Sequence, residues 1–242
     1  MPVTIASLSL SDLRIAQDKS SELANSLQSS EQERLAQISH SQRRIEFIFG
    51  HALLHACLAL HLPKWREQTK ICYKNNIPCV SSELHPNLDF NISHSADFFV
   101  CAVSSVSTVG IDVESSEFER DLLKIAWRHF HPKELKTLAT LSASEQAIRI
   151  RKLWTLKEST IKRLKSTIGH EGLKQQFVSE SDAELDKKLS SGHFSFHDAD
   201  CSVSLAPSLN LPRKMTVHEF DASLNSVDTR AYPVERFQLV EA

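Results

Sequence analysis

Hydrophobic positions along the chain follow two kinds of spacing, and each kind is gathered in its own stretches. Alternating positions or short apolar runs predict strands at residues 3–8, 69–73, 88–92, 98–103, 109–114, 194–196, 201–205 and 214–220. Positions three or four residues apart predict helices up to Leu60 and at 122–130, 132–141 and 145–165. Because strands and helices do not alternate regularly, the pattern favours an α+β fold of mainly antiparallel sheet.

The order of these elements predicts two lobes with a boundary near Thr108. The N-terminal lobe would comprise residues 1–108 and the C-terminal lobe residues 109–242. Residues 179–192 are rich in Ser, Asp, Glu and Lys, which predicts a surface loop or a short solvated helix.

Composition and charge are those of an ordinary soluble globular protein. Of the 242 residues, 41% are hydrophobic and 24% charged, and the formal net charge of −2 gives no general reason to expect nucleic-acid binding. No stretch approaches the roughly eighteen apolar residues of a membrane helix, and the N-terminus lacks a basic start followed by an apolar run. We therefore expect a cytoplasmic protein that binds no membrane.

The cysteines and histidines do not predict a zinc site. Five cysteines, an odd number without a C-x-x-C pair, favour free thiols over a disulfide framework. His51 and His55 are four residues apart on a predicted helix, but Ala52 stands where the zinc motif H-E-x-x-H requires the catalytic Glu.

The strand at 109–114 carries two acidic residues on one face. Val109, Ile111 and Val113 would face a core, while Asp112 and Glu114 point the other way. Carboxylate oxygens of this kind suit Mg²⁺, which takes one or two carboxylates together with phosphate oxygens. Taken alone, however, the pattern fits an edge strand with a solvated acidic face at least as well.

The helix at 145–165 places three chemically useful residues along one side. Trp154, Glu158 and Lys162 are spaced i, i+4 and i+8. The plain alternative is a helix-stabilising Glu–Lys pair of about 0.2–0.5 kcal/mol.

Upstream, the segment Leu88 to Val103 predicts two strands around a polar turn that carries Ser93 and His94. With the acidic strand that follows, it would form a meander that brings His94 close to the acids. A histidine beside serine and backbone N–H groups can bind phosphate, although a lone histidine in a turn is more often an ordinary surface residue.

Together these segments resemble the motifs of the 4′-phosphopantetheinyl transferase superfamily, of the monomeric, surfactin-synthetase-activating type. The family patterns F-N-x-S-H, G-[IV]-D-[IV]-E and W-[STC]-x-K-E-[AS]-x-x-K match residues 90–94, 110–114 and 154–162, in that order. Residues 130–134 are similar to the family stretch F-x-P-x-E, and 169–173 to its G-x-G-L turn. The resemblance covers about residues 30 to 180, and the last sixty residues carry no fingerprint.

The resemblance implies two pseudo-symmetric α+β lobes with coenzyme A and a metal in the cleft between them. It implies transfer of the phosphopantetheine arm of coenzyme A to a serine of an apo acyl or peptidyl carrier protein, with release of 3′,5′-ADP. A monomer is expected, and Mg²⁺ and Mn²⁺ both remain open as the metal.

The resemblance also assigns roles to individual residues. The metal ligands would be Asp112, Glu114 and Glu158. Glu158 would also position or deprotonate the serine, and Lys162 would meet the leaving phosphate. The coenzyme A contacts would come from Asn91, Ser93, His94, Lys157 and Lys162, and from Arg34 and Arg44 for the 3′-phosphate.

One departure concerns coenzyme A. Many relatives have G-K-P before the 88–92 strand, whereas this chain has Asn76-Ile77-Pro78, so Lys74 is the nearest lysine that could take that place. Both arginines can equally be solvated helix residues.

Two other functions remain open. A non-catalytic binder of coenzyme A or carrier protein would be expected to have lost Asp112, Glu158 or Lys162, and all three are present. A metal-dependent nuclease would carry its E-x-K on a strand and a basic surface, neither of which is indicated. The sequence does not identify the carrier protein.

Overall fold

A computed structural model describes residues 3–10, 13–116, 122–165, 174, 176–179, 191–196, 199–205 and 211–240. The chain forms two compact units, Met1–Val109 with Thr216–Ala231, and Gly110–Met215 with Tyr232–Ala242. The resembling turn at 169–173 and residues 180–190 of the predicted surface loop lie outside the described residues. None of the described helices is long and apolar enough to cross a membrane.

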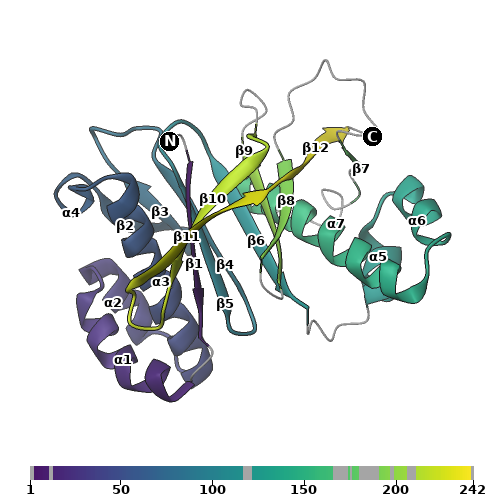
Figure 1. Cartoon of the computed structure of the whole chain (residues 1–242). Coiled ribbons are helices and arrows are strands. Elements are labelled where there is room, and N and C mark those ends of the chain that lie inside the picture. The colour runs from purple at the N-terminus through teal and green to yellow at the C-terminus, as the bar shows by residue number, and fades with distance from the viewer. Residues whose placement is uncertain are drawn as a thin grey trace. The chain divides into compact units, whose positions relative to one another are not determined.

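The first unit is built on a five-stranded sheet in the order β11-β10-β1-β5-β4 (Figure 1). Its strands are β1 (Val3–Ser9), β4 (Asp89–Ser95), β5 (Phe98–Ser104), β10 (Lys214–Phe220) and β11 (Ser226–Pro233). β1 pairs antiparallel with β5 and parallel with β10, although more than two hundred residues separate β1 from β10 in the sequence.

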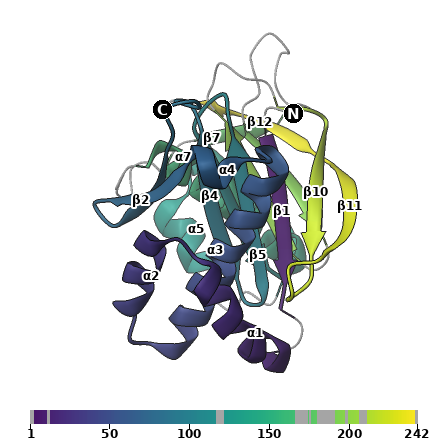
Figure 2. The same cartoon turned by 90° about the vertical axis from the view of Figure 1, so that its left-hand side faces the viewer.

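Helices cover one face of this sheet, as Figure 2 shows. They are α1 (Leu13–Ser26), α2 (Ser29–Ala36), α3 (Ser41–His61) and α4 (Trp65–Gln68). α3 packs directly on β1, β4 and β5, and α1 and α2 pack on α3. The core between α3 and the sheet includes Phe49, Leu53, Phe90 and Phe99.

A separate hairpin of β2 (Lys70–Lys74) and β3 (Ile77–Ser81) stands beside this sheet. Its turn residues, Asn75 and Asn76, have φ angles of 51° and 65°. Such positive φ angles at both central residues are typical of a two-residue hairpin, and asparagine adopts them readily. β3 was not predicted because Pro78 weakens its strand pattern, but the Asn-Asn pair was an available signal.

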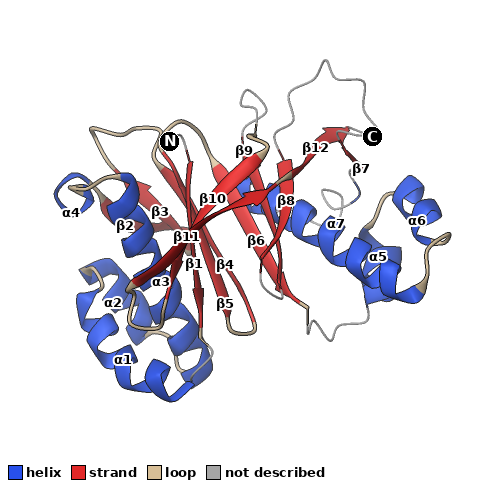
Figure 3. Ribbon diagram, in the orientation of Figure 1, coloured by secondary structure: helices blue, strands red, loops and turns tan. Residues whose placement is uncertain are grey.

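The second unit contains the other five-stranded sheet, in the order β6-β9-β8-β12-β7 (Figure 3). Its strands are β6 (Val109–Ser115), β7 (Gln176–Ser179), β8 (Ser191–Phe196), β9 (Ala199–Leu205) and β12 (Glu235–Val240). Its helices are α5 (Leu122–His129), α6 (Pro132–Leu138) and α7 (Ala143–Leu164), and α7 packs on β8 and β9.

The observed fold confirms the predicted α+β class with mainly antiparallel sheet. Two local predictions were wrong. Ser93 and His94 lie on strand β4, since the tight turn comes later, at Ala96 and Asp97. The acidic strand does not continue a meander either, because β6 pairs with β9 in the other sheet while β4 and β5 pair with each other.

Inside the first unit, a buried carboxylate joins α2 to α3. The Glu31 side chain is fully buried, and its two oxygens lie 2.6 Å from His51 Nδ1 and 2.8 Å from His55 Nε2. Burial raises the pKa of Glu31, but the hydrogen bonds with His51 and His55 outweigh it and bring the pKa down to about 2. Arg66 donates to the other nitrogen of His55, at 3.2 Å.

This cluster predicts an acid-sensitive contribution to folding stability. Because the folded pKa of Glu31, about 2, is below its ordinary value of 4.5, the contribution is full above about pH 4.5 and is lost as the pH falls toward 2. The lost contribution is on the order of 3 kcal/mol. The free energy of unfolding of the wild type and of Glu31→Gln can be measured with urea from pH 7 to pH 3. The difference between the two proteins should become smaller as the pH falls. A gap that is independent of pH would contradict this role of Glu31.

Candidate active site

The candidate site begins with a close approach of strand β6 to helix α7. A Cβ atom added at Gly110 would lie 2.6 Å from the backbone nitrogen of Arg163 and closer still to the carbonyl oxygen of Ser159. Only glycine therefore allows the strand and the helix to approach this closely at residue 110. The approach fixes which residues of α7 face the acidic residues of β6.

Two contacts join the facing residues. Lys162 Nζ lies 2.6 Å from Asp112 Oδ1, and the Asp112 side chain is 6% exposed. Trp154 Nε1 donates to Glu114 Oε1 at 3.1 Å. Asp112, the earlier acid on β6, contacts the later residue on α7, and Glu114 contacts the earlier one, so the two elements run antiparallel. The helix residue halfway between Trp154 and Lys162 therefore faces the strand between the two acids. That residue is Glu158, on the predicted side of the helix.

The three predicted metal ligands therefore come from two facing elements. Their carboxylate oxygens have the hardness that Mg²⁺ and Mn²⁺ prefer, so the donor set fits such a cation. Within the described parts of the chain, no three Asp, Glu, His or Cys side chains are grouped closely enough to hold a metal ion. Asp112 is instead neutralised by the ammonium group of Lys162.

Lys157 occupies a different environment from Lys162. Its side chain is fully buried, and its Nζ lies 2.9 Å from Glu134 Oε2. The ring centroids of Phe130 and Phe177 are 5.1 and 5.5 Å from the same nitrogen. Burial lowers the pKa of Lys157, and Glu134 opposes that shift. This environment favours a structural role for Lys157 over the predicted contact with the pyrophosphate.

Glu134 is a residue whose role the sequence did not reveal. It accepts hydrogen bonds from the backbone N–H groups of His131 and Phe177, both at 3.0 Å, and so ties the start of α6 to β7. With Lys157 it forms a buried ion pair. The spacing of Lys157 from buried Leu153 and Leu156 on α7 was the available signal that this lysine points inward.

The predicted coenzyme A residues of the first unit are divided between its α2 to α3 region and β4. Arg34 is half-buried and donates to Gln37 Oε1 at 3.0 Å. Arg44 Nη1 donates to the carbonyl oxygens of Leu35 and Ile38, at 2.7 and 3.1 Å, so it caps the end of α2. This use of its guanidinium favours the structural reading of Arg44.

On β4 the alternation of side chains separates the predicted residues. Asn91 and Ser93 share one face of the strand, and His94 lies on the other. His94 stacks on Phe99, with ring centroids 5.4 Å apart, and its Nε2 is 3.3 Å from Glu46 Oε2. Ser93 is buried, whereas His94 is exposed and is the better placed of the two to meet a ligand phosphate.

Part of the chain matches a known protein family. Residues 108–206, which hold β6, α7 and the facing residues of the candidate site, match the family model of the 4′-phosphopantetheinyl transferase superfamily. Over these residues the chain is similar to the 4′-phosphopantetheinyl transferase superfamily. The resemblance read from the three sequence motifs is thereby confirmed.

Individual members of the superfamily show the same relationship over part of their length. The 4′-phosphopantetheinyl transferase HetI of Nostoc sp. is 29% identical over 143 residues, which are 58% of this chain and 60% of HetI. The 4′-phosphopantetheinyl transferase gsp of Aneurinibacillus migulanus is 41% identical over 88 residues, 36% of this chain and 34% of gsp. The human L-aminoadipate-semialdehyde dehydrogenase-phosphopantetheinyl transferase is 29% identical over 163 residues, 63% of this chain and 52% of the human protein. The chain thus spans a third to three fifths of the length of these relatives.

The close approach at Gly110 leads to a prediction with a matched control. Gly110→Ala should lower the free energy of unfolding by about 1–3 kcal/mol, because the added methyl group pushes against the backbone of α7. Gly50→Ala is the control, since a Cβ atom at Gly50 would meet only side-chain atoms at 3.4 Å or more and alanine favours helix. Urea denaturation of both variants measures the difference, and equal stabilities would contradict the steric argument.

The buried pair on α7 gives a second prediction. Lys157→Met should cost about 3–5 kcal/mol of stability, because it leaves the Glu134 carboxylate buried without its cation. Adding Glu134→Gln should restore part of that loss. If Lys157→Met instead unfolds at the wild-type urea concentration, the structural role is contradicted and the predicted contact with coenzyme A is favoured.

Proposed function

We propose that this protein transfers the 4′-phosphopantetheine arm of coenzyme A to a serine hydroxyl of an apo acyl or peptidyl carrier protein, with a divalent cation, Mg²⁺ or Mn²⁺, as cofactor. The observation that carries the proposal is the contact of β6 with α7 through Asp112–Lys162 and Glu114–Trp154, and it is supported by the position of Glu158 midway between Trp154 and Lys162 on the helix. It is supported by the family of residues 108–206 and by relatives named as phosphopantetheinyl transferases.

The cation would be held by Asp112, Glu114 and Glu158. When bound, it would offset the charge that builds on the pyrophosphate of coenzyme A. The hydrogen bond from Trp154 to Glu114 orients one ligand carboxylate before any ion arrives, which lowers the cost of forming the site.

The chemical step needs a base and positive charge near one phosphorus atom. The serine oxygen forms a bond to the β-phosphorus, the bond to the leaving 3′,5′-ADP breaks, and the serine proton passes to Glu158 directly or through water. Lys162 is one helical turn from Glu158, so its ammonium group can support the leaving phosphate while Glu158 acts on the hydroxyl.

Coenzyme A recognition would draw on the first unit. Arg34 and His94 are the residues we assign to its phosphates, because both side chains reach solvent at least in part. Asn91 and Ser93 remain proposed contacts. Lys74 ends β2, is exposed, and is the lysine available where relatives carry G-K-P.

The central test removes the charge of one acidic side chain and keeps its size. Asp112→Asn should reduce phosphopantetheine transfer by about a hundredfold or more, because the variant loses a charged ligand and the partner of Lys162. Transfer is measured by intact mass spectrometry of apo carrier proteins incubated with enzyme, coenzyme A and Mg²⁺, with a chelator as the metal-free reaction. Glu158→Gln should give a similar loss if Glu158 takes the serine proton.

The matched control is Asp228→Asn. Asp228 also lies 2.6 Å from a basic partner, Arg230, but on strand β11 and outside the family match. This variant should transfer at the wild-type rate. Full transfer by Asp112→Asn would contradict the assigned role, and coenzyme A binding without transfer to any carrier would favour a non-catalytic binder. Metal-dependent cleavage of plasmid DNA that Asp112→Asn abolishes would favour the nuclease.

A further inference from the structure

The β2–β3 hairpin holds two cysteines directly opposite each other. Cys72 and Cys79 are register partners across the antiparallel pair, and their Sγ atoms are 2.8 Å apart. Directly opposed residues of antiparallel strands have Cα atoms about 4.5–5.5 Å apart. A disulfide spans Cα separations of about 4.4–6.8 Å, so the hairpin backbone needs no rearrangement to accept one.

The surroundings of this pair suit thiol chemistry. Lys70 and Lys74 occupy the same face of β2 as Cys72, two residues to either side. Both lysines are exposed, so this face of the hairpin is positively charged and open to solvent. The opposite face of the hairpin, which includes buried Ile71, carries the apolar packing.

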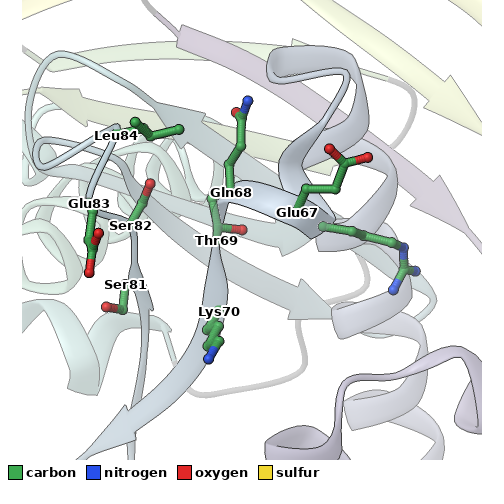
Figure 4. A pocket seen from close by; sticks show the side chains of 9 residues that line it. Glu67, Gln68, Thr69, Lys70, Ser81, Ser82, Glu83 and Leu84 are labelled. Carbon is green, nitrogen blue, oxygen red and sulfur yellow. The ribbon is translucent and has the colours of Figure 1, made fainter.

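Small molecules can reach this face of the hairpin. Cys72 and Cys79 are half-buried. The next residue pair on the same face of the ladder, Lys70 opposite Ser81, lines a surface pocket at the base of the hairpin, and Figure 4 shows both side chains there. The two cysteines are thus partly exposed, on a hairpin face that also borders a surface pocket.

The other three cysteines provide an internal contrast. Cys57, Cys101 and Cys201 are fully buried. Burial raises the pKa of the thiols of Cys101 and Cys201 well above the ordinary value, so they are protonated and unreactive in the folded chain. Cysteine oxidation in the folded protein should thus be confined to the hairpin.

We propose that Cys72 and Cys79 form a reversible disulfide across the β2–β3 hairpin when the protein meets a peroxide. One thiolate attacks the peroxide and becomes a sulfenic acid with release of one water; the second thiol displaces a second water and closes the S–S bond. The two sulfur atoms are oxidised and the peroxide is reduced to two water molecules. A dithiol reductant reverses the step.

The bond would act on a segment that is already anchored to α2. Ile71 donates its backbone N–H to Gln28 Oε1 at 2.9 Å and accepts from Ser30 Oγ at 2.6 Å. A disulfide one residue further along therefore joins β3 covalently to a strand held by the start of α2. Opening of β3 away from β2 is then suppressed, and hydrogen exchange of the amides in β3 slows.

The test uses the folded, full chain and requires no transferase activity. The reduced protein is treated with hydrogen peroxide, alkylated, and measured intact and after trypsin digestion. We expect a mass loss of about 2 Da that a dithiol reverses. We also expect the tryptic peptide Ile71–Lys74 to be linked to the peptide of residues 75–120, with the fragment ions placing the link at Cys79 and not at Cys101. Cys72→Ser and Cys79→Ser should both lose the mass change, and Cys201→Ser should keep it.

The outcomes are decisive for this pair and independent of the proposed function. No mass loss in folded wild-type protein overturns the proposal, as does a linkage through Cys57, Cys101 or Cys201. A gain of oxygen atoms on Cys72 or Cys79 without a crosslink shows single-thiol oxidation instead and also overturns it. Circular dichroism of each variant excludes the trivial case of unfolding.

Discussion

The candidate site depends on the contact between the backbone of β6 at Gly110 and the backbone of α7 at Ser159 and Arg163. A side chain at residue 110 would separate the helix from the strand, and the ion pair of Asp112 with Lys162 would be broken or lengthened. The glycine of the first motif therefore serves the chemistry indirectly. It sets a distance between two elements, and the charged residues on both sides use that distance.

Helix α7 is tied to its unit by basic residues that reach different elements. Arg151 pairs with Asp200 on β9, Lys152 with Glu235 on β12, Lys157 with Glu134 on α6, and Lys162 with Asp112 on β6. Each pair gives little net stability, because desolvation offsets the attraction. Their directions nevertheless differ, so together they disfavour both sliding and rotation of the helix. A site made from residues four apart on one helix needs that restraint.

Much of the fold could be predicted from the sequence, because long segments with regularly spaced hydrophobic residues are recognised easily. α7 was expected at 145–165 and is found at Ala143–Leu164, and the acidic strand is found where alternation placed it. The short or polar strands β7, β11 and β12 were missed, because their stability comes from partners far away in the sequence. Pairing of strands into sheets was misjudged for the same reason, as β6 shows.

The candidate site was predictable in kind and less so in detail. The sequence placed Trp154, Glu158 and Lys162 on one side of a helix, but it could not show that Trp154 bonds to Glu114. The sequence also assigned Lys157 to coenzyme A, because Lys157 and Lys162 look alike as residues of one helix. Only the structure shows that Lys157 is buried. Arg44 illustrates the same limit: a guanidinium that caps α2 and one that binds phosphate have the same local sequence signal.

The parallel pairing of β1 with β10 has a consequence for the order in which a ribosome-bound chain can fold. β1 is made first, yet its partner on one side, the segment Lys214–Phe220, leaves the ribosome only after β6, α7 and β9. Until then β1 keeps an open edge that can pair wrongly with other strands. The second sheet also waits for its last strand, since β12 joins β8 to β7 and is made after β10 and β11. Both units therefore complete their sheets only when the final segment of the chain has been made.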